Sequence, residues 1–182
     1  MPDTFDNLVL IGFPTAGKST QARLFAKRWG WRLMDTDELI AGTTGRKPGD
    51  IIAQDGEEAF RRIETETLQR FVDSGPRHHV VSTGGGLVSR EENWPLIRRL
   101  GPVIALLVKP ETAVYRQANA SHRVRRPLLE GDDPARKARE LMERRMPYYG
   151  RAEFQLHTDG MTKDAVQNEL VSLLATRYRL PN

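Results

Sequence analysis

The strongest chemical signal in the sequence is a glycine-rich segment near its start. Residues Gly12 to Ser19 read GFPTAGKS, which fits the pattern G-x-x-x-x-G-K-[ST]. The segment follows the aliphatic run Leu8–Ile11 and precedes a helical pattern, and this strand-turn-helix context is the one in which such loops bind phosphate. Loop amides and the helix N-terminus then direct positive charge at phosphate oxygens, while Lys18 reaches the β and γ phosphates. The alternative is a plain turn with a solvated lysine.

The same loop is expected to contact the metal ion that accompanies a nucleoside triphosphate. Ser19 directly follows the lysine, and the hydroxyl at this position of the pattern binds Mg²⁺. We therefore predict that the loop binds a nucleoside triphosphate together with Mg²⁺. The residues expected to bind the nucleotide are Gly12, Pro14, Thr15, Ala16, Gly17, Lys18, Ser19 and Thr20.

A pair of acidic residues, Asp35 and Asp37, marks a second candidate site after the short apolar run at 31–34. Open α/β sheets place their ligands at the carboxyl ends of their strands. In an extended segment, residues two apart point the same way. Asp35 is then expected to hold Mg²⁺ through its waters, and Asp37 to orient a substrate hydroxyl or take its proton. Both could instead be turn or helix N-cap residues.

Three successive glycines, Gly84, Gly85 and Gly86, follow the apolar run at 79–81. Such a run lowers stability, since glycine loses more conformational freedom on folding than any other residue. Close approach of the backbone to a ligand is one reason for it, and a flexible turn is the other. The arginine pairs at 61–62 and 144–145 are typical of solvated helix faces when each is taken alone.

Alternating apolar and amphipathic segments predict the fold. Strands are expected at 8–11, 31–34, 79–81, 103–108 and 154–156. Helical patterns lie between them, at 22–29, 38–44, 48 onward, 57–71, 91–100, 112–118 and 134–146, with a last one at 163–178. Apolar strands that alternate with helices are typical of a parallel sheet covered on both faces. We therefore predict a three-layer α/β fold.

Composition limits the class of protein. A length of 182 residues is enough for about one domain. Cysteine is absent, which excludes disulfides, thiol nucleophiles and cysteine-bound metals. Mean hydropathy is −0.55, and no apolar run approaches the roughly 20 residues of a membrane span. The first seven residues lack the basic region of a secretory signal, so a cytoplasmic protein without a membrane partner is expected.

The charged residues favour small anionic ligands. The formal net charge is +4, and only six of the 28 basic residues are lysines. Arginine binds carboxylate and phosphate through two parallel hydrogen bonds, so the bias favours such groups over diffuse charge attraction. The sequence pI near 9.6 also allows a nucleic-acid binder. The arginines are scattered without interleaved aromatic residues, however, and no nucleic-acid partner is predicted.

Six motifs occur together in the order and approximate spacing of the shikimate kinases. They are the phosphate-binding loop, DTD at 35–37, DGEEAFRRIE at 55–64, STGGG at 82–86, RRPLL at 125–129 and RRMPYY at 144–149. The chain therefore resembles that family over nearly its whole length. The resemblance implies phosphoryl transfer from ATP to the 3-hydroxyl of shikimate. It also implies a single P-loop kinase domain over 1–182 with a five-stranded parallel sheet, substrate-binding helices at about 36–71 and a mobile lid at about 119–133.

The resemblance assigns roles to individual residues. Those expected to bind shikimate are Asp37 at its hydroxyls, Arg61 and Arg145 at its carboxylate, and Gly84, Gly85 and Gly86 along the pocket wall. Glu64 lies one helical turn after Arg61, and this spacing predicts that Glu64 orients the Arg61 guanidinium. Phe60 is expected to pack near the substrate. The expected catalytic residues are Lys18, Asp37 and the lid residue Arg126, which closes over the phosphates. Arg116 resembles the arginine that stacks on adenine, and Ser19 and Asp35 are the expected metal ligands.

Three departures from the family pattern leave alternatives open. Thr15 stands where the family usually has glycine, and Ile52 stands where it often has an aromatic residue. The lid between Arg116 and Arg126 is also longer than in many relatives. A related kinase acting on another small hydroxy acid, or a nucleotide-binding paralogue without transfer activity, would fit these differences. A monomer is expected in each case.

Overall fold

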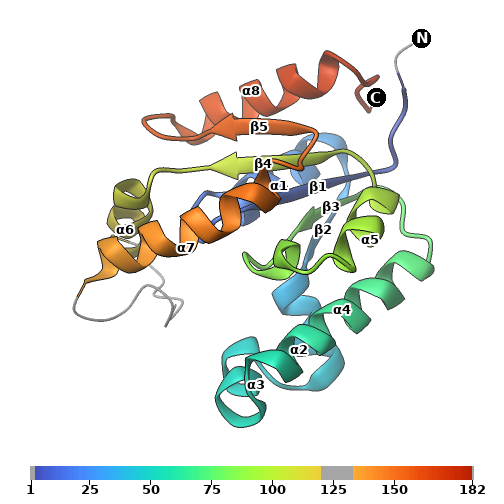
Figure 1. Cartoon of the computed structure of the whole chain (residues 1–182). Coiled ribbons are helices and arrows are strands. Elements are labelled where there is room, and N and C mark those ends of the chain that lie inside the picture. The colour runs from blue at the N-terminus through green and yellow to red at the C-terminus, as the bar shows by residue number, and fades with distance from the viewer. Residues whose placement is uncertain (1–2, 120–132, 182) are drawn as a thin grey trace.

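Five parallel strands form the sheet in the computed structural model, which describes residues 3–119 and 133–181. The strands are β1 (Asn7–Gly12), β2 (Arg32–Asp35), β3 (His79–Ser82), β4 (Val103–Leu107) and β5 (Phe154–His157). Their order is β2-β3-β1-β4-β5, and every neighbouring pair is parallel (Figure 1). The predicted sheet is confirmed, and the ends of each predicted strand lie within one residue of those observed.

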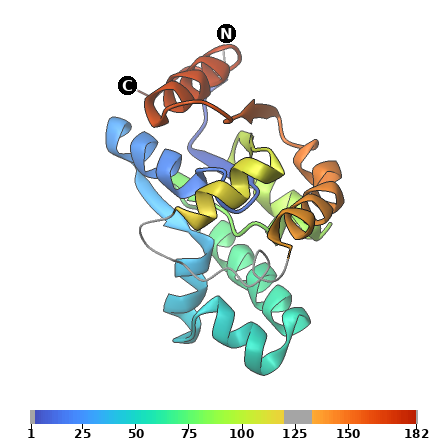
Figure 2. The ribbon, with the colours of Figure 1, turned by 90° about the vertical axis from the view of Figure 1, so that its left-hand side faces the viewer.

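Helices cover both faces of this sheet. They are α1 (Lys18–Trp29), α2 (Thr36–Thr44), α3 (Pro48–Asp55), α4 (Glu57–Asp73), α5 (Asn93–Leu100), α6 (Pro110–Ala118), α7 (Pro134–Tyr149) and α8 (Lys163–Ala175), with a short 3₁₀ helix η1 (Leu87–Ser89). Helices α1 and α8 lie on one face, and α4, α5 and α7 lie on the other (Figure 2). The three-layer prediction is thereby confirmed. No described helix is long and apolar enough to cross a membrane.

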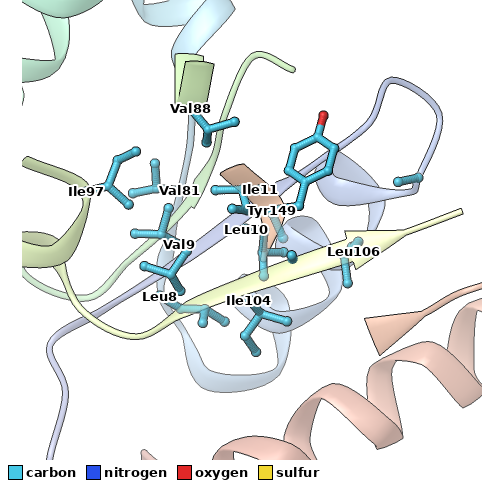
Figure 3. Close-up of a cluster of buried hydrophobic side chains, with 14 of the residues drawn as sticks. Leu8, Val9, Leu10, Ile11, Val81, Val88, Ile97, Ile104, Leu106 and Tyr149 are labelled. Carbon is cyan, nitrogen blue, oxygen red and sulfur yellow. The ribbon is translucent and has the colours of Figure 1, made fainter. Parts of the chain in front are cut away.

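Strand β1 lies at the centre of the hydrophobic core. All six of its residues are buried, and the side chains of Leu8–Ile11 are fully excluded from solvent. They pack with aliphatic residues of the neighbouring strands and of α5, among them Val81, Ile97 and Ile104 (Figure 3). A central strand covered on both faces buries both sets of alternating side chains, which explains why this segment is apolar throughout.

Helix α7 extends beyond its predicted end. It continues past Met146 to Tyr149, although Pro147 removes one backbone donor from its last turn. Tyr149 is only 1% exposed and belongs to the main core, so burial of its ring accounts for the extra turn. Helix α8 ends earlier than predicted, at Ala175, because the chain then pairs with the N-terminal segment in a bridge between Asp3 and Tyr178.

A second, smaller hydrophobic cluster lies away from the main core. It consists of Ile40 from α2, Ile51 from α3 and Phe60 from α4, with Ile63 packed against it. These three helices form the lower part of the molecule in Figure 1. The predicted substrate-binding region at 36–71 therefore has a small core of its own, joined to the sheet through α4.

Gly101 and Gly42 differ in whether the surrounding structure leaves room for a side chain. At Gly101, φ is +155° and an added Cβ would lie 3.0 Å from the carbonyl carbon of Asn7. At Gly42, within α2, an added Cβ would meet nothing within 4 Å. We expect Gly101→Ala to lower the free energy of unfolding by about 2 kcal/mol or more. Gly42→Ala should raise it by about 0.5–1 kcal/mol. Urea unfolding measures both, and a stable Gly101→Ala protein would contradict the packing at this turn.

Candidate active site

The carboxyl ends of three neighbouring strands bring the predicted site residues to one edge of the sheet. Asp35 at the end of β2 pairs in register with Ser82 at the end of β3, and Leu10 of β1 pairs with the same serine. The loops that leave these strands carry the phosphate-binding segment, the two aspartates and the three glycines. Segments separated by 20 to 70 residues therefore meet where an α/β sheet binds its ligands.

The phosphate-binding loop has the geometry that its sequence predicts. Gly12 and Gly17 have φ values of +142° and +98°, which favour glycine, and α1 begins directly afterwards at Lys18. No side chain caps the N-terminus of α1 within the described chain, so its first amides face the loop. The Lys18 ammonium donates to the carbonyl oxygens of Gly12 and Phe13, at 2.9 and 3.0 Å. This arrangement suits a phosphate anion.

Three side chains that carry oxygen atoms meet at the N-terminus of α1. The Ser19 hydroxyl donates to Asp35 Oδ2 at 3.1 Å and lies 3.1 Å from the hydroxyl of Ser82. Sequence reasoning paired Ser19 with Asp35 as metal ligands but did not single out Ser82. Hydroxyl and carboxylate oxygens are the ligands that Mg²⁺ prefers. In the described part of the chain no group of three or more His, Cys, Asp or Glu residues is placed to hold a metal.

The extended arrangement expected for Asp35 and Asp37 is wrong. Helix α2 begins at Thr36, so Asp37 lies in its first turn, and Asp35 is the N-cap. The Asp35 carboxylate accepts a hydrogen bond from the Asp37 amide at 3.0 Å, which satisfies one of the free donors of the helix. The two carboxylates therefore face different partners. Asp35 contacts Ser19, while an added Cβ at Gly84 would lie 2.9 Å from Asp37 Oδ1.

The three glycines at 84–86 make room for four charged side chains. An added Cβ at Gly84 would meet Asp37 and, at 3.1 Å, Glu64 Oε1. One at Gly85 would lie 3.1 Å from Arg145 Nη1, and one at Gly86 would lie 2.6 Å from Arg61 Cζ. Side chains at these positions would occupy the space of the charged groups. Close approach of other groups to the backbone is therefore the physical reason for this glycine run, and a flexible turn does not describe it.

Arg61 and Glu64 form a close ion pair on α4, as predicted from their spacing. Arg61 Nη1 lies 2.5 Å from Glu64 Oε2, and Arg61 Nη2 lies 2.9 Å from Glu57. Burial of Glu64, which is 2% exposed, raises its pKa to about 7, although the attraction of Arg61 acts in the opposite direction. Repulsion from Asp37 raises the pKa further. The Arg61 guanidinium also lies 5.3 Å from the centre of the Phe60 ring.

Arg145 is the most unusual arginine of the site. Its side chain is buried at 6% exposure, and its Nη1 atom has no hydrogen-bond partner among the described residues. Burial lowers its pKa, and the nearby Arg61 adds to that effect, whereas Tyr149 and Glu64 oppose it. A buried guanidinium nitrogen without a partner costs free energy, and an anionic ligand would remove that cost.

Tyr149 supports Arg145 and was not assigned a role from the sequence. It lies one helical turn after Arg145 on α7, and its hydroxyl donates to the carbonyl oxygen of Gly85 at 3.4 Å. The same hydroxyl interacts with the Arg145 guanidinium. Figure 3 shows the ring among Leu10 and Ile11, with the hydroxyl oxygen pointing away from them. The i, i+4 spacing from Arg145 is the signal that could have identified Tyr149.

Arg116 contacts the phosphate-binding loop. Its guanidinium donates to the Thr15 carbonyl oxygen at 3.3 Å, to Thr158 Oγ1 at 3.1 Å and to the Thr158 carbonyl oxygen at 2.8 Å. Thr158 follows β5 and is fully buried, and sequence reasoning did not identify it. Arg126, and the predicted lid at about 119–133 apart from its end residues, lie outside the residues that the structure describes.

A family model for shikimate kinase matches residues 14–175. The chain belongs to the shikimate kinase family. Curated shikimate kinases of Moorella thermoacetica and Symbiobacterium thermophilum are each 40% identical to it, covering 92% and 94% of this chain and 94% and 97% of those proteins. A solved shikimate kinase from Acinetobacter baumannii, in complex with shikimate, is 30% identical, with a TM-score of 0.84 and 97% of each chain covered. The family membership predicted from the six motifs is thus confirmed.

The raised pKa of Glu64 predicts a pH-dependent contribution to stability. The carboxyl binds a proton in the folded chain up to about pH 7, whereas in the unfolded chain its pKa is near 4.5. Between these values the folded state holds more protons, so the contribution of Glu64 to stability falls as pH rises from about 4.5 to 7. It is constant above and below that range. Arg61 stays charged throughout, since its pKa is raised further: burial lowers it, but attraction to Glu64 and Glu57 outweighs burial.

The matched variant is Glu64→Gln, which keeps the shape of the side chain and cannot ionise. We expect the free energy of unfolding of the unmodified chain to fall relative to that of Glu64→Gln between pH 5 and 7. Urea unfolding at half-unit pH intervals measures the difference. A difference that stays constant across this range, or grows with pH, would show that Glu64 titrates below it.

Proposed function

We propose that this member of the shikimate kinase family transfers the γ-phosphoryl group of ATP to the 3-hydroxyl of shikimate. The observation that carries the proposal is the joint position of two sites at one sheet edge. The phosphate-binding loop leaves β1, and the side chains of Asp37, Arg61 and Arg145 lie against the loop that leaves the neighbouring β3. Phosphate donor and acceptor would then lie side by side, which is the main requirement of phosphoryl transfer.

The acceptor pocket suits a small acid with several hydroxyl groups. Arg145 Nη1 is buried without a hydrogen-bond partner in the described chain, and Arg61 lies close enough to affect its pKa. Two guanidinium groups at one end of the pocket would bind a carboxylate through charge-assisted hydrogen bonds. Asp37, which lies beside Gly84, would accept hydrogen bonds from hydroxyl groups. The solved relative in complex with shikimate supports this choice of acid.

The proposed reaction uses the chain's residues for position and charge. Asp37 holds the reacting hydroxyl and accepts its proton as the oxygen attacks the γ-phosphorus. The bond from that phosphorus to the β,γ-bridging oxygen breaks, and ADP leaves with the bonding electrons. Lys18 and the amides at the start of α1 stabilise the charge on the phosphate oxygens. Arg126 is assigned to the same phosphates from the sequence pattern alone.

Ser19 and Asp35 would hold the Mg²⁺ ion that accompanies ATP. Their oxygens lie 3.1 Å apart, and the Ser82 hydroxyl is equally close to Ser19, so the donor set fits a hard divalent cation. Mg²⁺ usually takes only one or two protein carboxylates and completes its shell with water and phosphate. When bound, the ion neutralises charge on the β and γ phosphates. Arg116 is assigned to the nucleotide base, and the chain is proposed to act as a cytoplasmic monomer.

The direct test is to incubate the chain with Mg²⁺, ATP and shikimate and to identify the products by mass spectrometry. We expect ADP and singly phosphorylated shikimate, and no phosphorylation of gluconate or nucleoside monophosphates. In Asp37→Asn we expect turnover to fall by at least about 10²-fold, because the hydroxyl loses its proton acceptor. Calorimetry should find ATP binding unchanged in this variant. If ATP binding were lost as well, Asp37 would be a structural residue of the loop region.

Neighbouring arginines on α7 provide a matched pair for testing the acceptor pocket. Arg145 is buried, whereas Arg144 is exposed and donates from its Nε atom to the Glu140 carbonyl oxygen at 3.3 Å. We expect Arg145→Ala to raise the KM for shikimate by at least about 10²-fold, since a buried charge-assisted hydrogen bond is lost. Arg144→Ala should leave it within about twofold. Steady-state kinetics at saturating ATP compare the two, and equal effects would remove Arg145 from the pocket.

A further inference from the structure

The phosphate-binding loop contains a backbone conformation that its residue type disfavours. Thr15 has a φ of +69°, in the left-handed region, and only one other described residue besides glycine, His78, has a positive φ. A β-branched residue rarely adopts this conformation, because its side chain crowds the backbone. Such strain persists when surrounding contacts fix the residue, and it occurs most often at functional sites. The contacts of Thr15 are therefore informative.

Thr15 is joined to α6 by two hydrogen bonds that run in opposite directions. Its hydroxyl donates to the carbonyl oxygen of Ala113 at 3.1 Å, and its own carbonyl oxygen accepts from Arg116 Nη1 at 3.3 Å. Ala113 is fully buried, so its carbonyl group is held in place by the core. Arg116 is fixed in turn by its two hydrogen bonds to Thr158. The side chain and the main chain of one residue thus bind the same helix.

This pair of contacts depends on both the hydroxyl and the backbone conformation of Thr15. A glycine could adopt the same φ with less strain but would lack the donor to Ala113. A valine would keep the shape of the side chain but would also lack the donor. Serine would keep the donor and lose one methyl group. The three substitutions therefore separate the hydroxyl from the shape of the residue.

From this geometry we infer that Thr15 is a positioning residue that couples the phosphate-binding loop to α6 and so sets the guanidinium of Arg116 relative to the bound nucleotide. Thr15 acts through Arg116 and Ala113, and its own hydroxyl donates to α6. The inference deepens the proposed function on its ATP side, and it rests on that function for the identity of the nucleotide and for the place of Arg116 beside it. It does not depend on which acceptor the chain uses.

The test measures binding of Mg²⁺-ADP by calorimetry in the full chain, without an acceptor. We expect Thr15→Val and Thr15→Gly to raise the dissociation constant about 5- to 10-fold, the effect of losing one hydrogen bond that orders the site. Thr15→Ser should stay within about twofold of the unmodified chain. Thermal unfolding of each variant checks that it is folded at the assay temperature. If Thr15→Val is not folded there, the contrast between Thr15→Gly and Thr15→Ser decides.

A double-mutant cycle with Arg116→Ala separates coupling from a general structural effect. Residues in one hydrogen-bond network give non-additive effects, whereas independent ones add. We expect Thr15→Val to weaken Mg²⁺-ADP binding less than about twofold in the Arg116→Ala background. Equal binding by Thr15→Val and the unmodified chain, or a full additive loss in the Arg116→Ala background, would overturn the inference. Failure of the shikimate assignment would appear separately, as ADP binding without shikimate phosphorylation.

Discussion

The burial of Glu64 between two guanidinium groups is the constraint on which the acceptor half of the molecule depends. A carboxyl group at 2% exposure is costly unless it is neutral or paired, and here both conditions are partly met. Arg61 lies beside it on the same helix, and Arg145 approaches from α7. These side chains meet only because Gly84, Gly85 and Gly86 leave the volume free. The last turn of α7 and the buried ring of Tyr149 complete this arrangement, because they hold the Arg145 guanidinium near Glu64.

The two halves of the site are joined by the sheet and by short contacts at its edge. Ser19 at the start of α1 contacts Asp35 after β2 and Ser82 in β3, so donor and acceptor loops share one hydrogen-bonded group. Pro14 of the phosphate-binding loop lies close to Gly85, where an added Cβ would be 3.0 Å from Pro14 Cδ. Strand pairing and loop packing therefore fix the distance between the phosphate-binding loop and the loop at Gly84–Gly86. Because strand pairing and loop packing both act over short distances, a change in either loop would shift the other loop.

Much of the fold and part of the site could be predicted from the sequence. The strands are continuous apolar runs or short segments bounded by turn residues, and Gly30 and Gly45 end α1 and α2 with the left-handed φ expected of C-caps. The phosphate-binding loop and the Arg61–Glu64 pair follow from local spacing. The sequence did not predict local backbone geometry that depends on the tertiary structure. Asp35 caps a helix that the pattern placed two residues later, which turned Asp37 toward the glycines.

Other site features had at most a weak signal in the sequence, because their partners are distant along the chain. Thr15 combines a positive φ with a hydrogen bond to Ala113 of α6, about 100 residues away, and Thr158 after β5 accepts hydrogen bonds from Arg116 of the same helix. Tyr149 looked like an ordinary helix residue until its ring was placed in the main core. Motif reading finds residues that act through their own chemistry. It overlooks residues that act by holding others, because their partners are distant in the sequence.

The separate small core of Ile40, Ile51 and Phe60 has a consequence for how the molecule moves. Helices α2 and α3 bury their apolar side chains mainly in this cluster. They connect to the sheet through α4 and the short strand β2. Breaking a cluster of this size exposes far less apolar surface than unfolding the sheet, so these helices form a local unit of lower stability. Their amide hydrogens are expected to exchange with solvent through partial opening while those of β1 stay protected. The proposed acceptor side would then be able to open locally while β1 and the loop that follows it stay folded.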